Sequence, residues 1–375
     1  MFRPIDMHCD TLMLGILQEK KGGPQADLMK MSGMVDFERM IRGNYMAQFF
    51  AVWMLPPGHE KWFGCSFEDE EYINAGTKIF NQSVAAHQDI VGAAKNADEI
   101  RRNFLNGKIS AVLTMEDGRA VDGKLENIKK FYDAGYRALS IIWNNENCFA
   151  YPNAWDAEAH KLGLKPFGKE AIQYMQELGM LVDVSHLNEG GFFDCVDILK
   201  KPIVATHSNA RALCNHKRNL TDEQLKALAK NGGITGINFG PEFSNADTQT
   251  AESNDHDINQ TAAQLAKHAR YIADIAGVAT VALGTDFDGI SGNLEIGSCD
   301  KMYILENALR KEGFTEAELD MISYRNALRV MDEAMKYGRI RSCRHRIQSC
   351  RKVRTKAASE LKTAPAIPGA VFYVQ

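Results

Sequence analysis

Short apolar runs alternate along the chain with segments whose apolar residues recur at helical spacing. Eight runs are rich in Val, Ile, Leu, Phe, Met and Ala with little polar alternation, as expected of parallel strands buried on both faces. These predicted strands are Pro4–Cys9, Tyr45–Trp53, Ser110–Met115, Ala138–Trp143, Met180–Ser185, Pro202–Thr206, Gly233–Phe239 and Thr280–Gly284. The helical spacing is clearest in Glu70–His87, Leu125–Ala134, Lys169–Leu178, Thr221–Lys230 and Thr261–Ala276. Strands that alternate with helices indicate βαβ units and a parallel sheet.

Eight such units predict an α/β protein folded as a closed (β/α)8 TIM barrel. In an open, dinucleotide-binding sheet, a glycine-rich fingerprint follows the first strand. This chain has no such fingerprint there, which also favours the closed barrel. In a barrel, the connections that follow the strands build the active-site face. Three long segments fall on such connections, namely Leu55–Phe67, Asn144–Leu164 and Glu242–Asp257.

The C-terminal part of the chain divides into a helix and a basic tail. Residues 315–336 predict one closing helix that begins with the capping-box pair Thr315 and Glu318. With no linker before it, we expect a single catalytic domain over residues 1–338. Residues 339–375 hold nine Lys and Arg but one acid, and we expect this basic extension to be solvated and poorly ordered.

Charge and composition narrow the functional classes. The tail carries +8 and the whole chain −4, so the first 338 residues carry −12, which argues against nucleic-acid binding by the main domain. Hydrophobic residues make up 45% and charged residues 25%, as in a globular protein. No apolar run approaches the roughly 18 residues of a membrane span, and the N-terminal segment lacks a secretory-signal pattern. Eight cysteines without a CxxC pair predict reduced thiols and a cytoplasmic protein.

Residues able to bind metal stand at the carboxyl ends of the predicted strands. His8 and Asp10 follow the first strand and, two positions apart, point to one face of an extended chain. Glu116 follows the third strand, where a carboxylate needs a metal or a cation as its partner. His186 and His207 end the fifth and sixth strands. Each residue alone is more often structural, but their joint position at one mouth of a barrel favours a metal site.

The ligand types indicate which metal and how many ions. A mixed set of imidazoles and carboxylates suits Zn²⁺. So many ligands would satisfy two ions that share a carboxylate and a hydroxide. The eighth strand delivers one further acid, Asp286, to the same mouth.

Several motifs in these segments resemble those of the membrane (renal) dipeptidase family. They are D-x-H-x-D at Asp6–Asp10, MEDG at 115–118, PFGKEAIQYMQELGMLVDVSH at 166–186, THSNAR at 206–211, NHKRNL at 215–220 and GTDFDG at 284–289. The resemblance runs from residue 4 to about 335. It implies an amidohydrolase-like TIM barrel that binds two zinc ions and hydrolyses the peptide bond of dipeptides with a metal-bridging hydroxide.

Carried over motif by motif, the resemblance assigns the metal ligands. His8 and Asp10 would bind one zinc ion, His186 and His207 would bind the other, and Glu116 would bridge the two. Glu116 thereby belongs to the catalytic residues as well as to the ligands.

Two further residues receive roles in the reaction from the resemblance. Asp286 matches the family's acid/base carboxylate, which can take a proton from water and pass it to the departing amine. Arg218 matches the arginine that holds the substrate's terminal carboxylate. Its fork of donors fits a carboxylate in bidentate fashion, which would limit substrates to short peptides with a free C-terminus.

At one position the chain departs from the family pattern. The best-known members carry a histidine at the end of the fourth strand, where this chain has Trp143. An indole donates one hydrogen bond and cannot exchange a proton near pH 7. Either its N–H, or an amide of Asn144, Asn145 or Asn147, replaces the histidine as an oxyanion donor, or the preferred substrate and the rate differ. Trp143 and Asn144 are therefore expected to bind substrate.

The sequence thus predicts a cytoplasmic, zinc-dependent dipeptidase. One alternative is a related amidohydrolase-like enzyme that acts on another amide or ester with the same metals. A second is a metal-bound, catalytically weak protein that binds peptides, for which Trp143 is the one supporting feature. A dipeptide is the expected partner, nucleic acid is not, and a homodimer is left open.

Overall fold

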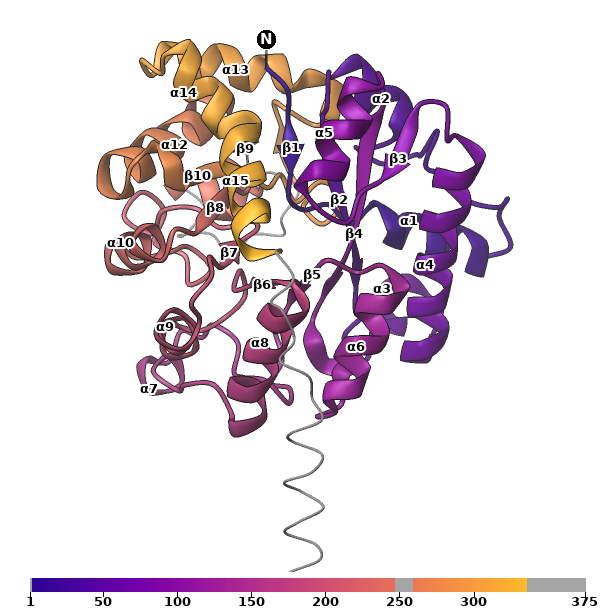
Figure 1. Ribbon diagram of the computed structural model, residues 1–375, viewed down its shortest axis with the longest axis horizontal. Helices are drawn as coiled ribbons and strands as arrows, with labels where there is room; N and C mark the ends of the chain where they lie inside the picture. Colours follow the sequence, from indigo (N-terminus) through magenta and orange to yellow (C-terminus); the bar gives the residue numbers. More distant parts are fainter. Residues whose placement is uncertain (1, 247–258, 336–375) are drawn as a thin grey trace, which may run out of the picture. The chain divides into compact units, whose positions relative to one another are not determined.

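A ring of eight parallel strands forms the centre of the part of the chain that the computed structural model describes, residues 2–246 and 259–335 (Figure 1). Neighbours around the ring follow the order β1-β2-β4-β5-β6-β7-β8-β10, and β1 pairs with β10 to close it. The strands are β1 (Ile5–Asp6), β2 (Ala47–Trp53), β4 (Ile109–Glu116), β5 (Ala138–Ser140), β6 (Leu181–Asp183), β7 (Val204–Ala205), β8 (Ile234–Ile237) and β10 (Val281–Leu283). All eight predicted runs contribute a strand, which confirms the TIM barrel.

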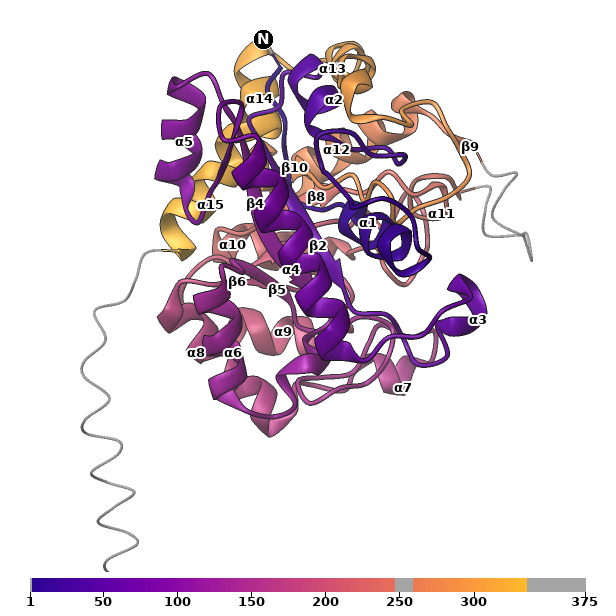
Figure 2. The same ribbon diagram turned by 90° about the vertical axis from the view of Figure 1, so that its right-hand side faces the viewer.

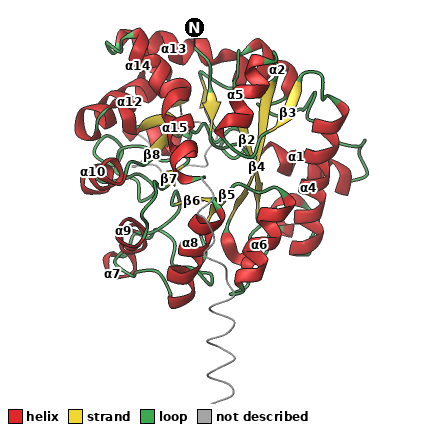
Figure 3. Cartoon of the chain, viewed as in Figure 1, coloured by secondary structure: helices red, strands yellow, loops and turns green. Residues whose placement is uncertain are grey.

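Helices surround the ring, as Figure 3 shows. The five predicted helices are confirmed as α4 (Asp69–Ala86), α6 (Leu125–Ala134), α8 (Pro166–Leu178), α10 (Asp222–Asn231) and α12 (Ala262–Ala276). The other α-helices of the described residues before residue 312 are α1 (Thr11–Lys20), α2 (Phe37–Arg42), α3 (Glu60–Phe63), α5 (Ala97–Leu105), α7 (Ala157–His160), α9 (Glu189–Ile198), α11 (Pro241–Ser244) and α13 (Met302–Lys311). Capping boxes begin α10 and α12, because the hydroxyls of Thr221 and Thr261 accept hydrogen bonds from main-chain N–H groups of the first turn.

The predicted helix over residues 315–336 is confirmed over residues 316–334, except that one turn has a different winding. Its capping box is present at Thr315, but a turn of π-helix at Met321–Arg325 separates α14 (Glu316–Asp320) from α15 (Asn326–Ala334). Buried Asn326 begins α15 and donates from Nδ2 to the carbonyl oxygens of Val278 and Val281. Helical periodicity does not reveal such an anchor to a distant segment.

Three strands outside the ring were not predicted. β3 (Val91–Ala93) pairs with the first half of β4, and β9 (Asn259–Gln260) pairs with β11 (Asn293–Leu294). All three are short and contain glycine or asparagine, so they lack the apolar run that marks the ring strands.

Side chains of one buried cluster fill the interior of the ring. The cluster contains alternate strand residues such as Phe49, Val112, Leu181 and Ile234, together with Val330 of α15. A barrel interior of this kind is a packed core and not a pore. Function is therefore expected at the carboxyl ends of the strands.

Some expectations concern residues outside the described ranges. The basic tail from residue 339 lies outside them, as does most of the Glu242–Asp257 connection. Helices of the described ranges are all too short or too polar to cross a membrane. None of the six described cysteines takes part in a disulfide bond. The cytoplasmic location and the domain boundary at 338 stay predictions.

Candidate active site

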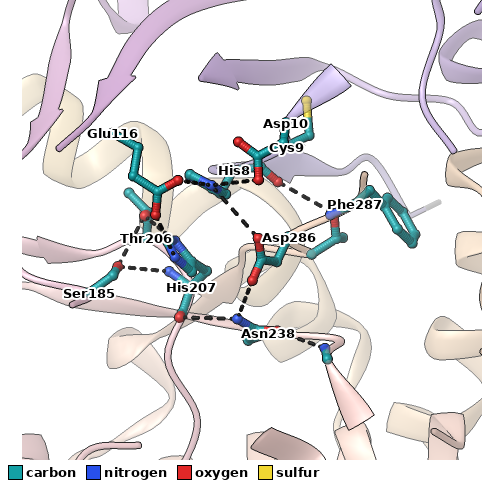
Figure 4. Close-up of polar contacts among 12 residues, drawn as sticks. His8, Cys9, Asp10, Glu116, Ser185, Thr206, His207, Asn238, Asp286 and Phe287 are labelled. Atoms are coloured by element: carbon teal, nitrogen blue, oxygen red, sulfur yellow. Dashed lines mark hydrogen bonds and ion pairs between the residues drawn. The ribbon is translucent and has the colours of Figure 1, made fainter. Parts of the chain in front are cut away.

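Five predicted site residues converge at the carboxyl ends of the ring strands, and Figure 4 shows His8, Glu116, His207 and Asp286 among them. His8 lies two residues after β1, Glu116 ends β4, His186 lies three residues after β6, His207 two after β7 and Asp286 three after β10. All five residues are more than nine-tenths buried. Residues from segments almost 280 positions apart are thus held in one small volume.

Glu116 lies between two groups of potential ligands. Its Oε1 atom is 2.8 Å from Nε2 of His186 and 3.5 Å from Nε2 of His207. Its Oε2 atom is 3.4 Å from Nε2 of His8, and that nitrogen is 3.7 Å from Oδ2 of Asp10. One carboxylate oxygen therefore faces each pair, which is the arrangement expected of a bridging ligand.

Hydrogen bonds at the far side of two rings fix which nitrogen faces the cluster. Thr206 donates its hydroxyl hydrogen to Asp183 (2.6 Å), so it accepts from Nδ1–H of His207 (2.8 Å). The side-chain oxygen of Asn144 accepts from Nδ1–H of His186 (3.1 Å). Both Nε2 atoms then carry lone pairs, and they lie 3.1 Å apart. Two facing lone pairs are stable together only with a cation between them.

The other pair has two buried atoms that a cation could bind. Nε2 of His8 and Oδ1 of Asp10 are buried and have no hydrogen-bond partner among the described residues. A buried polar atom without a partner costs free energy that a bound ion would recover. The donor set of imidazole nitrogens and carboxylate oxygens is the one that Zn²⁺ prefers. The residues present therefore fit a metal centre.

Burial controls the protonation of these groups. It lowers the pKa of His186 to about 4, with the positive charge of Arg218 as a further cause. It raises the pKa of Asp286 to about 8 and that of Asp10 to about 6. The negative charge of Glu116 also raises both values, whereas His8 lowers both. At pH 7 the metal-free site thus has a neutral His186 and a largely protonated Asp286.

Metal binding is expected to release protons for this reason. A bound cation favours the carboxylate form of Asp286, so zinc affinity should rise with pH toward the pKa of about 8. Calorimetric titration at pH 7, in buffers of different ionisation enthalpy, counts the protons released. The Asp286→Asn variant should release about one proton fewer per chain. Equal release by both proteins would show that Asp286 is already ionised without metal.

Two features of the connection after β10 orient Asp286. Its backbone is left-handed, with φ of 63°, and its Oδ2 atom accepts a hydrogen bond from Asn238 (2.8 Å; Figure 4). A side chain at Gly289 would collide with Oδ2 of Asp10 and come within 2.8 Å of Oδ1 of Asp286. Glycine is needed here because the main chain lies too close to both carboxylates for any side chain. This steric role of Gly289 was not identified from the sequence.

Arg218 is buried beside the cluster. Its terminal nitrogens donate to the carbonyl oxygens of Ser185 and His207 and to the hydroxyl of Ser208. Its Nε atom is buried without a hydrogen-bond partner among the described residues. The guanidinium is thus fixed in place by three bonds and retains a donor for a ligand.

Trp143 and Asn144 lie at the same cavity, which has a volume of about 360 Å³. Trp143 is half-buried and packs edge to face on Trp53, with ring centroids 5.0 Å apart. Asn144 uses its oxygen on His186, as described above, which leaves its amide N–H groups as donors. Asn147, the more distant candidate, donates to Asp117 and to the carbonyl of Ile141 instead.

Asp183, whose hydrogen bonds hold the segments that carry His186 and His207, was not identified from the sequence. The carboxylate of Asp183 accepts hydrogen bonds from Ser140, Ser185 and Thr206 and so ties together the ends of β5, β6 and β7. The available signal was an acid within the apolar run LVDVSH, where a charge needs partners.

Removal of the Thr206 hydroxyl is expected to weaken metal binding. Thr206→Val leaves Nδ1–H of His207 without an acceptor, and loss of such a partner typically lowers metal affinity about 10–100-fold. Competition with a zinc-binding dye measures the affinity. Thr235→Val is a matched control, because that buried hydroxyl donates to the carbonyl of Ser208 and contacts none of the proposed ligands. Unchanged affinity in Thr206→Val would contradict the role.

Known sequences match the chain over most of its length. Residues 1–342 match the family model described as membrane dipeptidase, peptidase family M19. An uncharacterized protein in the pqqA 5′ region of Klebsiella pneumoniae is 35% identical over 259 residues, which cover 68% of this chain and 92% of that protein. Dipeptidase aclJ of Aspergillus oryzae is 28% identical over 304 residues, 80% of this chain and 70% of that protein.

Solved structures share the fold. Dipeptidase AC, a metallopeptidase of family M19, superposes with a TM-score of 0.78 at 23% identity and covers 89% of this chain and 99% of its own. A metallopeptidase from Rhodobacter sphaeroides, liganded with a phosphinate mimic of the dipeptide L-Ala-D-Ala, gives 0.76 at 23% identity, with 89% and 100% covered. Because the family model matches more than nine-tenths of the residues, this chain belongs to the membrane dipeptidase family, peptidase family M19.

Proposed function

We propose that this protein is a two-zinc metallopeptidase that hydrolyses the peptide bond of dipeptides. The observation that carries the proposal is the buried cluster of histidines and carboxylates around the two oxygens of Glu116. Membership of a dipeptidase family supports the reaction type. The phosphinate dipeptide mimic bound by the Rhodobacter sphaeroides relative supports a dipeptide substrate.

The two carboxylate oxygens of Glu116 face different groups of ligands, and this arrangement suggests how the ligands are shared between two ions. His8 and Asp10 would hold one ion, His186 and His207 the other, and Glu116 both. Bound zinc would polarise the scissile carbonyl and activate a water as the nucleophile near neutral pH.

Asp286 serves as general base and then as general acid. Asn238 holds its Oδ2 atom, while Oδ1 faces the cluster, 3.8 Å from Nε2 of His8. Oδ1 accepts the proton of the attacking water and returns it to the nitrogen of the departing amine. The single hydrogen bond from Asn238 keeps the carboxylate aimed at the cluster through both transfers.

Arg218 and Asn144 position the substrate. The unpartnered Nε–H of Arg218 donates to the terminal carboxylate, which restricts the site to short peptides with a free C-terminus. The amide N–H of Asn144 donates to the oxygen of the scissile carbonyl as its negative charge develops. Trp143 contributes a ring surface beside His186, with ring centroids 6.0 Å apart.

Assays of zinc-loaded and chelator-treated protein test the proposal. Dipeptides should be hydrolysed with zinc and not after its removal, and their C-terminal amides should react much more slowly. Turnover of simple amides or esters but not of dipeptides would instead favour a related amidohydrolase-like activity. Tight binding of dipeptides without turnover would favour a peptide-binding protein.

A further inference from the structure

Aromatic rings cover part of the cavity that holds the proposed metal centre. Trp53, Trp62, Phe63 and Trp143 all line it, and we call these four residues the aromatic wall. Trp53 contacts both Trp143 and Phe63 edge to face, with ring centroids 5.0 and 6.4 Å apart. Phe63 in turn contacts Trp62 at 6.3 Å. The four rings therefore form one continuous chain of contacts.

The wall runs from the metal ligands to the solvent. Trp143 lies against His186 at its inner end, Trp53 is 9% exposed, and Trp62 is 64% exposed. Trp62 and Phe63 belong to α3, which stands away from the ring strands in Figure 2. A ligand that reached the metal centre would thus pass along the rings and keep contact with them.

Most polar groups of the cavity have other roles in this proposal, and Glu242 also lines it. Glu116, Asp10 and Asp286 belong to the metal centre, and Arg218 to the terminal carboxylate. Asp288 accepts hydrogen bonds from Thr11 and from the main-chain N–H of Met34. These groups address the peptide backbone of a substrate. The aromatic wall, together with Met13 and Phe243, is the apolar lining left for its side chains.

We infer that the aromatic wall selects dipeptides that carry a large apolar side chain, aromatic above all, over those with only small side chains. The inference rests on the dipeptidase activity proposed above and specifies its substrate class. A bound aromatic ring would bury apolar area and make edge-to-face contacts with several rings at once. One methylene in an apolar pocket can change specificity by tenfold or more, so we expect a preference of at least about tenfold in kcat/KM for a ring.

The chain offers a matched pair of tryptophans for the test. Trp62 is 64% exposed and lines the cavity, whereas Trp155 is 66% exposed, packs on His216 and is not among the lining residues. Replacement of either exposed ring removes little buried surface, so neither variant is expected to unfold. Trp62→Ala shortens the wall, Trp62→Phe restores most of its apolar surface, and Trp155→Ala controls for the loss of a surface tryptophan.

The experiment compares kcat/KM of the zinc-loaded proteins for Ala-Ala, Phe-Ala and Ala-Phe. The wild type should prefer one of the phenylalanine dipeptides to Ala-Ala by about tenfold or more. Trp62→Ala should reduce that ratio several-fold, Trp62→Phe should restore most of it, and Trp155→Ala should leave it unchanged.

Other results would overturn the inference in distinguishable ways. Hydrolysis of all three dipeptides without a preference, or a preference that Trp62→Ala leaves intact, would contradict the role of the wall alone. An equal fall in Trp155→Ala would show a general surface effect. Failure of the zinc-loaded wild type to hydrolyse any dipeptide would contradict the proposed function itself.

Discussion

Glu116→Ala should remove most of the bound metal and nearly all activity. The two oxygens of Glu116 face both ligand pairs, at 2.8 Å from His186 and 3.4 Å from His8. Without it, each proposed ion keeps two protein ligands, one fewer than catalytic zinc sites usually have. We expect zinc content to fall below half of the wild-type value and kcat/KM to fall on the order of 10³-fold or more. Elemental analysis and dipeptide turnover measure the two effects.

A neighbouring acid provides the control for this variant. Asp117 is also buried, but its carboxylate accepts hydrogen bonds from Asn147 and from the main-chain N–H of Arg119. Asp117→Asn should therefore retain its zinc. Full zinc occupancy in Glu116→Ala would show that the carboxylate does not bridge the ligand pairs.

Asp286→Asn should lower kcat while the protein keeps its metal. Asparagine preserves the size of the side chain, tolerates the left-handed backbone, and can still accept from Asn238 through its amide oxygen. It cannot carry the proton from the water to the amine. Loss of a general base or acid typically costs about 10²–10⁴-fold in rate, and KM should change little because the ground-state contacts remain.

The adjacent acid separates this effect from a general loss of charge. Asp288 lines the cavity but is held by the hydroxyl of Thr11 and the N–H of Met34. Asp288→Asn should therefore cost much less in kcat than Asp286→Asn. If Asp286→Asn kept kcat within threefold of the wild type, another group would have to transfer the proton.

The fold was largely predictable because its strands are buried on both faces. Such strands are continuous apolar runs, and each of the eight ring strands overlaps one of them. Strand β3 was missed because its three residues include a glycine and end at an exposed alanine. The turn of π-helix before Asn326 was not predicted because apolar periodicity does not distinguish it from an α-helical turn.

The positions of the candidate ligands could be predicted from the sequence, but the contacts that hold them in place could not. His8, Glu116 and His207 could be singled out because they stand at the ends of apolar runs, where a buried polar side chain needs a binding partner. The support of His207 by Asp183 through Thr206, and the close approach of Gly289 to Asp10, could not be predicted. These contacts join segments that are distant in the sequence, and the spacing of apolar residues within one segment gives no information about them.

Asn144 has a second role that was not predicted from the sequence. The sequence placed it beside the substrate because it follows the fourth predicted strand. In the structure its oxygen also accepts from Nδ1–H of His186, which fixes the tautomer of that ring. An amide has both a donor and an acceptor, and only the folded geometry shows which one is already in use.

A zinc titration of the metal-free protein, with dipeptide hydrolysis followed at each addition, tests the two-zinc dipeptidase most directly. Activity should be absent at the start, rise with added zinc, and level off at about two ions per chain, as expected of a two-metal site. Hydrolysis that persists without metal, or two bound zinc ions without hydrolysis of any dipeptide, would contradict the proposed function.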